Sequence, residues 1–589
     1  MTQENSLYNI RHSLAHILAN AVQNLFPGTK LGFGPPVDFG FYYDFLLPAP
    51  INEESFPKIE AEMNRLIKER QEFSFKDLPL EAAYGQIEKM GEPYKREYAQ
   101  EIADKNGLKE LRFYTNGTFV DMCEGPHVKN SQEIPKGCFK IRNLAGAYWR
   151  GDSNNTMMTR IYVWAYESRE VLDAKIKEYK LALENDHKKL GKELDLFIID
   201  DVVGKGLPLW TPNGCVLRDE MEKLMKELEF QGDYVRVCTP HISRTELFYQ
   251  TGHLPYYKDD MFPIMEVKEE SYCLKPMNCP HHHRIYASKP RSYRELPLRL
   301  AEYGQVYRYE SAGSLSGLLR VRGLCQNDAH IYCTEDQVQS EFLAVMELHK
   351  KLYNIIGFKN YHMRFSTWDP KDPKGKEKYI DDPIGWEKAQ NLVRKAMLES
   401  KLPFEEKAGE AAFYGPKIDF QFKSVTGREE TASTNQLDFG IPPRLNLRYI
   451  AADNKEYYPY IIHRAVAGSH ERFISFLIEH FGGAFPTWLA PIQVMIIPVN
   501  DSNIEYCQKL IKEMKSHYMR VQMDVSENSF NKKIRINVMQ KIPNLIIVGD
   551  KEMENNQVSV RKYGQQGQQV IPFSQFLQEI LESIKNRTL

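Results

Sequence analysis

Two histidines lie four residues apart near the start of the chain, in the stretch RHSLAHILAN. The apolar residues around His12 and His16 follow a helical pattern, and a helix brings positions i and i+4 onto one face. Two stacked imidazoles can hold a metal ion, carry out acid–base chemistry, or be two surface histidines without a role. A pair alone favours the last interpretation, so a function for these residues depends on partners elsewhere in the chain.

A second pair with the same spacing, Cys123 and His127, occurs in the stretch DMCEGPHV. Gly125 and Pro126 lie between the two, so the sequence predicts a loop here and not a helix.

The elements that position these residues belong to a chain of 589 residues, which is too long for one core and predicts about three or four domains. The formal net charge of −2 gives no global sign of a nucleic-acid partner, although a large enzyme can carry a local basic face. Nine scattered cysteines fit a reducing compartment better than a disulfide framework. The polar start MTQENSLYNI and the lack of any run of about eighteen apolar residues predict a cytoplasmic protein with no membrane span.

Hydrophobic periodicity predicts an α+β multidomain protein. Residues 1–166 mix short strands such as GFYYDFLL and RIYVWAY with amphipathic helices, and residues 167–190 are predicted to form one connecting helix. Residues 191–488 begin with a long amphipathic helix, CVLRDEMEKLMKELEF, and continue with strand runs whose hairpin-length gaps indicate a mostly antiparallel sheet. Residues 489–589 carry buried strand runs, IQVMIIPVN, YMRVQMDV and NLIIVGD, which are typical of a small, mostly parallel α/β domain.

Three segments of the middle region resemble the signature motifs of the class II aminoacyl-tRNA synthetases. They are the long helix with a strand ending at Pro240, the YRYE segment of Tyr307 to Glu310 with its returning strand, and GSHERF of Gly468 to Phe473. Segments such as KPMNCP, DAHIYCTE and YGPKI are similar to the threonyl-tRNA synthetases, and this resemblance covers essentially all 589 residues. It implies activation of L-threonine with ATP and Mg²⁺, transfer to tRNA(Thr), a class II antiparallel sheet flanked by helices, and a homodimer formed through the first motif.

The chemistry of activation explains why arginines occur in these motifs. The amino-acid carboxylate attacks the α-phosphorus of ATP, which requires fixed cations that align and neutralise the phosphates. Arg308, expected on a strand, can fork onto the α-phosphate, and Arg472 can hold the far phosphates with a bidentate geometry that lysine lacks; the resemblance assigns both these roles. It also implies Glu310 at the adenine amino group and Arg320 beside the phosphates.

The resemblance further implies a threonine and adenylate pocket, in which Asp328 faces the ammonium group. Lys417 joins the two arginines as a catalytic residue, and Gln436 contacts ATP. Each of these polar residues has the alternative of being a satisfied core residue. The pocket residues are Gln326, Asp328, Tyr414, Lys417 and Gln436.

One zinc ion per chain is implied by resemblance at Cys279, His330 and His463, whose spacing alone would not identify them. Threonine and valine are nearly isosteric, and an apolar pocket distinguishes a hydroxyl from a methyl poorly. A zinc ion that takes the amino group and the hydroxyl rejects valine, so its role is selection more than hydrolysis. The neighbouring His281 to His283, in PHHHR, form a rival ligand cluster.

The opening histidines gain partners through the same resemblance. His12, His16, Cys123 and His127 resemble the editing site of bacterial-type threonyl-tRNA synthetases, which is related to alanyl-tRNA editing domains. Such a site hydrolyses mischarged seryl-tRNA, and the tetrad is also a possible zinc site. Residues at matching positions, expected to hold the terminal adenosine or the seryl group, are Tyr43, Lys95 and Asp121.

The C-terminal region resembles the anticodon-binding domain of this subgroup. Matching VGDKE and VSVRK implies that Glu552 and Arg561 read anticodon base edges, and an arginine fork suits guanine. The nearby NKKIR supplies either phosphate-binding charge or a solvated helix face.

Several positions depart from the family pattern: His281 stands where a small residue is usual, Ser316 where histidine is common, and His470 lies inside the third motif. The chain starts eleven residues before His12, so we expect it to lack the N-terminal ubiquitin-like domain of many family members. Two rival functions remain, a non-catalytic RNA-binding paralogue and a free-standing hydrolase of mischarged tRNA. The complete set of motif arginines and zinc ligands argues against the first, and the second explains only the first third of the chain.

Overall fold

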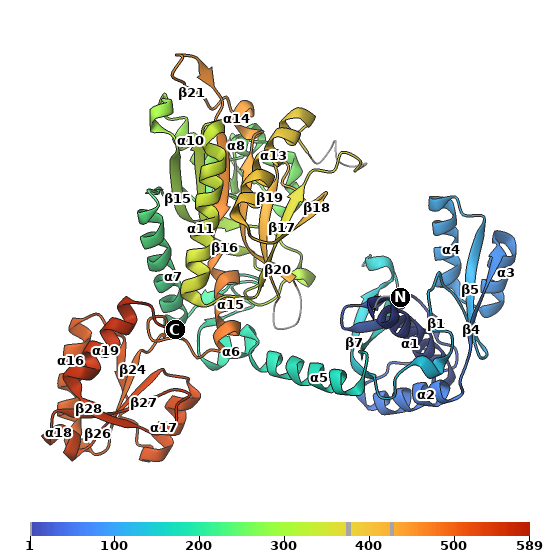
Figure 1. The fold of residues 1–589 in the computed structure, drawn as a ribbon, viewed down its shortest axis with the longest axis horizontal. Helices are drawn as coiled ribbons and strands as arrows, with labels where there is room; N and C mark the ends of the chain where they lie inside the picture. Colours follow the sequence, from blue (N-terminus) through green and yellow to red (C-terminus); the bar gives the residue numbers. More distant parts are fainter. Residues whose placement is uncertain (1–2, 153, 373–378, 424–428) are drawn as a thin grey trace. The chain divides into compact units, whose positions relative to one another are not determined.

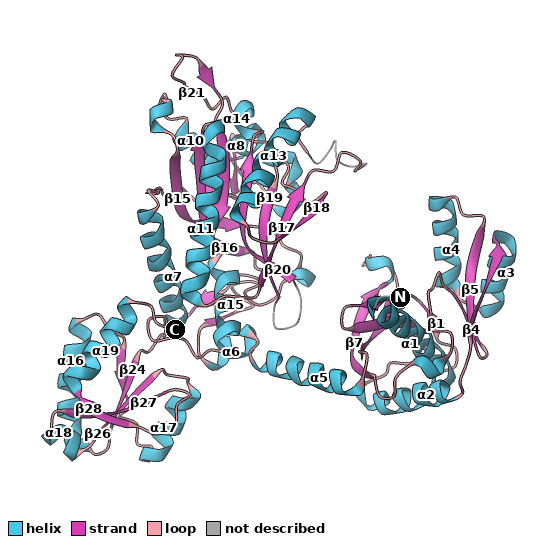
Figure 2. Cartoon of the chain, in the orientation of Figure 1, coloured by secondary structure: helices cyan, strands magenta, loops and turns pink. Residues whose placement is uncertain are grey.

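The structure is a computed structural model that describes residues 3–152, 154–372, 379–423 and 429–589. It divides into two compact units, residues 1–180 and 181–589. Figure 2 shows that both contain helices and sheets, as the sequence predicts. Among the described residues, no helix is long and apolar enough to cross a membrane.

The first unit is built around helix α1 (Gln3–Leu25), whose buried face includes Leu14, Ile17 and Leu18. This face packs with the sheet β1-β3-β8-β7, in which β2 extends β3 (Figure 1). The strands predicted from GFYYDFLL and RIYVWAY are β3 and β8. The elements are β1 (Lys30–Leu31), β2 (Pro36–Val37), β3 (Gly40–Leu46), α2 (Phe56–Lys68), β7 (Phe139–Tyr148) and β8 (Met157–Ala165).

A second, three-stranded sheet of this unit carries the other half of the tetrad. Its order is β4-β5-β6, and helices α3 and α4 pack on it through a separate small core that includes Ile87, Ala99 and Phe113. The residues that follow β6, including Cys123 and His127, form no helix or strand, as predicted. The elements are β4 (Phe73–Pro79), α3 (Leu80–Met90), α4 (Pro93–Asn106), β5 (Glu110–Asn116) and β6 (Phe119–Met122).

The predicted single connecting helix is wrong, because the segment forms two helices, α5 (Arg169–Glu184) and α6 (His187–Glu193). Asp186 caps the second helix: its side chain accepts a hydrogen bond from the Lys188 backbone N–H at 2.7 Å. An N-cap residue takes non-helical backbone angles, so the helix is interrupted at Asp186 although the helical sequence pattern runs on through this position.

The middle region is an eight-stranded sheet in the order β11-β15-β16-β23-β20-β19-β17-β18. All its pairings are antiparallel except β11 with β15 and β17 with β18, which confirms the predicted sheet type. The strands are β11 (Val235–Arg236), β15 (Leu298–Tyr307), β16 (Gly323–Cys333), β17 (Tyr361–Thr367), β18 (Phe404–Ala408), β19 (Lys417–Lys423), β20 (Glu429–Asp438) and β23 (Tyr460–Ala465).

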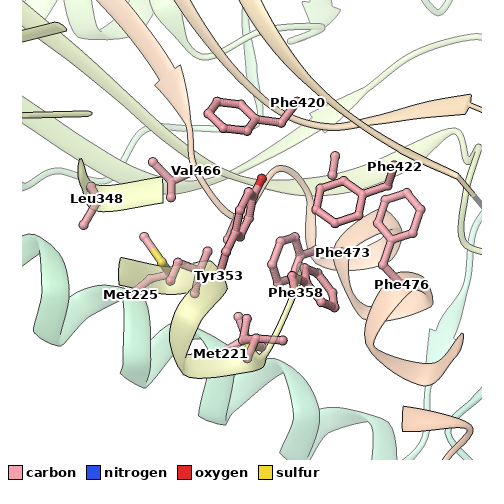
Figure 3. Packing of buried hydrophobic residues seen from close by; sticks show 14 of the residues in the cluster. Met221, Met225, Leu348, Tyr353, Phe358, Phe420, Phe422, Val466, Phe473 and Phe476 are labelled. Atoms are coloured by element: carbon pink, nitrogen blue, oxygen red, sulfur yellow. The ribbon is translucent and has the colours of Figure 1, made fainter. Parts of the chain in front are cut away.

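Helices cover one face of this sheet and form the largest core (Figures 1 and 3). Figure 3 shows Tyr353 lying between Met221 and Phe420, with Phe422 beside it. The core includes residues of α7 (Pro212–Gln231), α11 (Val338–Ile356), α13 (Pro383–Ser400) and α15 (His470–Phe481). Successive residues of a strand point to opposite faces of the sheet, so the residues between the core positions project from the other face.

The smaller elements of this region lie around the sheet. A three-stranded sheet, β12-β14-β13, and a two-stranded pair, β21-β22, accompany it. Their bounds are β12 (Ile242–Arg244), α8 (Thr245–Gln250), α9 (His253–Tyr256), β13 (Met265–Val267), β14 (Glu270–Leu274), α10 (Cys279–Tyr286), α14 (Ile441–Arg444), β21 (Tyr449–Ile450) and β22 (Glu456–Tyr457), with β9 (Phe197–Ile198) and β10 (Leu209–Trp210) preceding α7.

The C-terminal region is a five-stranded sheet in the order β25-β24-β26-β27-β28. The three predicted strands pair in parallel, but β27 and β28 pair antiparallel, so the sheet is mixed and not mostly parallel. Helices α16 and α19 pack on one face and α17 on the other (Figure 1). The elements are β24 (Val494–Pro498), α16 (Ile504–Ser516), β25 (Val521–Met523), α17 (Phe530–Met539), β26 (Asn544–Val548), α18 (Asp550–Glu554), β27 (Gln557–Lys562), β28 (Gln569–Pro572) and α19 (Phe573–Lys585).

Candidate active site and editing site

A row of polar side chains crosses the central sheet on the face opposite the large core. His330 pairs with His463, His463 with Gln436, and Gln436 with Lys417, across strands β16, β23, β20 and β19. Residues directly opposite each other in a sheet project from the same face, so these four side chains lie side by side. The register therefore assembles a site from segments far apart in the chain.

Strand β16 adds two more residues to that face. Gln326, Asp328 and His330 alternate along the strand, and alternate residues point the same way. The Asn278 amide donates to Asp328 Oδ2 at 3.0 Å. Burial raises the pKa of Asp328 because it disfavours an isolated charge, and a cationic partner at this carboxyl group would offset that cost.

Cys279, His330 and His463 meet at the centre of the row. Each offers a ligand atom, and these atoms lie within 4.8 Å of one another. All three residues are buried, and burial keeps the pKa of His330 well below its usual range, so this imidazole is neutral, the form that binds metals. Cysteine and histidine donors are those that zinc prefers, and three of them leave a tetrahedral position open.

The histidines after Cys279 lie in α10 and are all buried. His283 forms, with Asp438 and His463, a second possible metal group in the described part of the chain. His282 is instead hydrogen-bonded at both ring nitrogens, to His330 and to Glu302.

Two residues beside Cys279 and His463 were not predicted from the sequence. His253, in α9, has its Nε2 at 3.5 Å from Cys279 Sγ, and Asp438 Oδ2 lies at 2.9 Å from Nε2 of His463. Neither contact has a sequence signal, because no spacing connects these residues with the ligands. The Asp438 contact leaves the other His463 nitrogen for a metal.

Tyr414 and Lys417 lie beside Gln436 in the same row. The Tyr414 hydroxyl donates to Gln436 Oε1 at 2.6 Å, and the Tyr414 ring stacks on His463 with centroids 4.7 Å apart. The Lys417 ammonium lies at 2.8 Å from Asp419 Oδ2.

The motif arginines surround the segment that follows β15. The expectation that Arg308 lies on a strand is wrong by one residue, since β15 ends at Tyr307, and the Arg308 Nε donates to the Pro276 carbonyl at 3.3 Å. Arg320 pairs with Glu310 at 2.8 Å. Arg472 donates Nε to the Leu319 carbonyl at 3.0 Å.

Burial lowers the pKa of Arg472, and the neighbouring Arg308 and Arg320 lower it further, although its carboxylate neighbours oppose this. Three guanidinium groups close enough to affect one another make a site that suits a polyanion.

His470, the departure inside the third motif, is a buried link to α7. Its Nδ1 accepts from Arg218 at 3.1 Å, and its ring stacks on Tyr303 with centroids 4.8 Å apart. Ser316, another departure, pairs with Arg320 in an isolated bridge.

The four residues predicted as a tetrad meet in the first unit. The ligand atoms of His12, His16, Cys123 and His127 lie within 4.8 Å of one another. Cys123 Sγ lies 3.1 Å from His12 Nε2 and 3.3 Å from His127 Nε2. Burial lowers the pKa of His12 to about 4 and raises that of Cys123 to about 12, so both are neutral near pH 7.

A buried charge cluster lies beside the tetrad. Asp121 Oδ2 accepts from the Tyr43 hydroxyl at 2.7 Å and from the Lys95 ammonium at 3.0 Å, and His16 Nε2 is 3.9 Å away. All these residues are buried. The predicted editing residues thus form one contiguous polar site on α1, β3, α4 and β6 and the loop after it.

The two predicted anticodon readers lie on adjacent elements. Glu552, in α18, accepts from the Ser559 hydroxyl at 2.9 Å, and Arg561 follows two residues later on β27. The Glu552 carboxylate also accepts from the Gly549 N–H at 3.0 Å.

Family comparisons agree with this arrangement. Residues 262–481 match the profile "tRNA synthetase class II core domain (G, H, P, S and T)". Residues 493–583 match "Anticodon binding domain", and residues 111–162 match "Threonyl and Alanyl tRNA synthetase second additional domain".

Individual relatives cover nearly the whole chain. A threonine–tRNA ligase of Staphylococcus carnosus is 45% identical over 99% of this chain and 89% of its own length. One of Halalkalibacterium halodurans is 43% identical over 99% of this chain and 90% of its own length.

Solved structures are similar as well. The RNA binding domain of threonyl-tRNA synthetase from Cryptosporidium parvum Iowa II has a TM-score of 0.64 at 33% identity, covering 67% of this chain and 98% of that one. A prolyl-tRNA synthetase of Cryptosporidium parvum shares the fold, with a TM-score of 0.52 at 13% identity over 68% of this chain and 74% of that one.

Proposed function

This chain belongs to the threonine–tRNA ligase family, and from that premise we propose which of its residues carry each step of the reaction. The ligase activates threonine with ATP and Mg²⁺, forming threonyl-adenylate and pyrophosphate, and transfers threonine to tRNA(Thr). The observation that carries the assignment of the site is the row from His330 to Lys417 across four strands.

Phosphate binding falls to the arginines. Arg308 takes the α-phosphate, Arg472 the far phosphates, and Arg320 lies beside them. The Arg472 guanidinium is already held by backbone carbonyls of Leu319 and Thr431, which fixes its direction before ATP arrives. Glu310, paired with Arg320, is positioned to turn to the adenine amino group.

Threonine occupies the polar face of the sheet, where Asp328 faces its ammonium group. Gln326 and Tyr414 complete the threonine contacts, and Gln436 and Lys417 lie where the adenylate forms. Cys279, His330 and His463 hold a zinc ion, and their donor types, burial and mutual distances fit one. Bound zinc supplies a Lewis acid for the amino and hydroxyl groups of threonine, which valine cannot satisfy.

Editing of seryl-tRNA(Thr) falls to the first unit, and its match to the threonyl and alanyl second additional domain supports this. Hydrolysis of the ester requires a positioned water and a proton for the departing ribose oxygen. The neutral imidazoles of His12, His16 and His127 and the Cys123 thiol suit these tasks, and the donor set also fits a metal ion. Tyr43, Lys95 and Asp121 hold the adenosine or the seryl group.

Glu552 and Arg561 read anticodon bases in the C-terminal domain. A homodimer forms through α7 and β11, whose exposed Phe230 (82%) and Val235 (50%) support a surface that a second copy covers. Nine free cysteines support a reducing compartment, the cytoplasm. In this division residues 1–166 carry editing, residues 167–190 connect the domains, residues 191–488 carry activation and transfer, and residues 489–589 bind the anticodon.

Charging of tRNA tests the proposal. Purified protein should esterify tRNA(Thr) with threonine, and Arg308→Ala and Arg472→Ala should each reduce this sharply while the protein still binds tRNA. Binding of tRNA without charging by the unmodified protein would favour the non-catalytic paralogue. Hydrolysis of seryl-tRNA(Thr) without charging would favour the free-standing hydrolase.

A further inference from the structure

His282 connects a proposed zinc ligand with a buried carboxylate. It lies in α10, three residues after Cys279, and its side chain is fully buried. Its Nδ1 is 2.8 Å from Nδ1 of His330, and its Nε2 is 3.0 Å from Oε2 of Glu302. A chain of two hydrogen bonds therefore runs from Glu302 through His282 to His330.

Glu302 anchors the outer end of this chain. It lies on β15, directly opposite Asp328, so it projects from the same face of the sheet as the zinc group. Its Oε1 accepts from the Thr239 backbone N–H at 2.7 Å, and the Lys275 ammonium is 3.8 Å away. Burial alone would raise the pKa of Glu302, but the His282 hydrogen bond and the Lys275 charge outweigh it and lower the pKa, so the group is an ionised acceptor.

The direction of each proton follows from that acceptor. A carboxylate only accepts, so Nε2 of His282 carries the proton and donates to Glu302. A zinc-binding His330 keeps its lone pair on Nε2 and its proton on Nδ1, so Nδ1 of His282, which faces it at 2.8 Å, accepts from Nδ1–H of His330. His330 is left with a lone pair on Nε2, the nitrogen that remains for a metal ion.

We propose that Glu302 and His282 are positioning residues that fix the tautomer and ring orientation of the zinc ligand His330. The inference rests on the proposed zinc site. His463 has a separate carboxylate partner, Asp438, at 2.9 Å, so each imidazole ligand is held by a hydrogen bond of its own. Partners of this kind typically change metal affinity by about 10- to 100-fold when they are removed.

Glu302→Gln tests the proton direction without changing shape. The Thr239 N–H can only donate, so the new amide oxygen takes the Oε1 position and the NH₂ group faces His282. That NH₂ donates to Nε2 of His282, whose Nδ1 must then carry the proton and donate to His330. The proton of His330 moves to Nε2, which removes the lone pair that a metal needs. We expect zinc affinity to fall about 10- to 100-fold.

The matched control is Glu341→Gln, which alters another buried carboxylate of the same domain. Glu341 accepts two hydrogen bonds from Arg299, each 2.7 Å. It has no contact with the relay, which is the hydrogen-bonded chain Glu302, His282 and His330. A second series uses His282→Asn, whose amide oxygen takes the place of Nδ1 as an acceptor, and His282→Ala, which has none. We expect the asparagine variant to keep more zinc than the alanine variant.

Zinc affinity is measured by competition with a chromogenic chelator on the full chain, together with the metal content after purification. ATP–pyrophosphate exchange provides a second readout, in which KM for threonine should rise while KM for ATP stays unchanged. Glu302→Gln with the zinc affinity and threonine KM of the wild type overturns the relay. Equal zinc loss in the asparagine and alanine variants of His282 also overturns it.

Failure of the zinc site itself gives a different result. In that case wild type and Cys279→Ala contain the same amount of zinc, and both the site and the relay are refuted. Zinc loss in Cys279→Ala with none in Glu302→Gln refutes the relay alone.

Discussion

Removing two groups of the tetrad should abolish editing and spare threonine charging. Cys123 Sγ is within hydrogen-bond distance of both His12 and His127, so Cys123→Ala removes the partner of both rings. His12→Ala removes one of the three imidazoles of the site. The double variant leaves His16, Asp121 and the synthetic domain intact. We therefore expect a specific loss of seryl-tRNA(Thr) hydrolysis.

The size of the effect follows from two general magnitudes. Positioned acid–base groups accelerate a reaction by about 10²–10⁴-fold, so hydrolysis of seryl-tRNA(Thr) should slow by about 100-fold or more. The methyl group that separates serine from threonine is worth about 1–3 kcal/mol, or about 10- to 200-fold. Without editing, about one product in 10 to 200 should then carry serine when both amino acids are present equally.

The assay follows the deacylation of preformed seryl-tRNA(Thr), and a second measurement follows threonine charging. Cys138→Ala is the matched control, since it removes a buried thiol from the same unit at a place outside the tetrad. It should deacylate seryl-tRNA(Thr) at the wild-type rate. Equal rates for the wild type and the double variant would mean that α1 merely carries two histidines.

Three further outcomes are expected. Cys279→Ala should lose its zinc and its threonine-dependent exchange, and a wild-type zinc content in metal analysis would refute the assignment. Arg561→Ala should weaken charging of tRNA(Thr) by about 1–3 kcal/mol and leave adenylate formation intact; a parallel fall in pyrophosphate exchange would indicate a structural role. Burial lowers the pKa of His349 from 6.5 to about 3, so the unfolded chain binds a proton that the folded chain refuses, and stability present above pH 6.5 is lost as the pH falls toward 3. His349→Phe keeps a ring against Phe420. Between pH 7.5 and 5 its free energy of unfolding should therefore fall by about 2 kcal/mol less than that of the wild type; thermal unfolding with the same pH dependence in both proteins would contradict this.

Local periodicity predicted that His12 and His16 share a face, because a helix returns after four residues. Gln326, Asp328 and His330 share a face of β16 because a strand repeats every two residues, but only the family resemblance had indicated these residues. The mixed pairing in the C-terminal sheet was missed because a strand run does not reveal the direction of its partner.

The assembly of distant residues could not be predicted from local patterns. The row from His330 to Lys417 depends on the order β16-β23-β20-β19, and only the family resemblance suggested that these segments meet. The partners Glu302 and Asp438 had no signal at all, since buried carboxylates look like any other acidic residue in a sequence. Tertiary contacts alone distinguish them.

Threonine-dependent exchange of pyrophosphate into ATP tests the central claim most directly. The purified protein should exchange rapidly with threonine, detectably with serine, which also offers an amino and a hydroxyl group, and negligibly with valine. Tight discrimination against valine follows from a site that binds the hydroxyl group directly. Absence of exchange with threonine, or equal exchange with valine, would contradict the assignment of the active site.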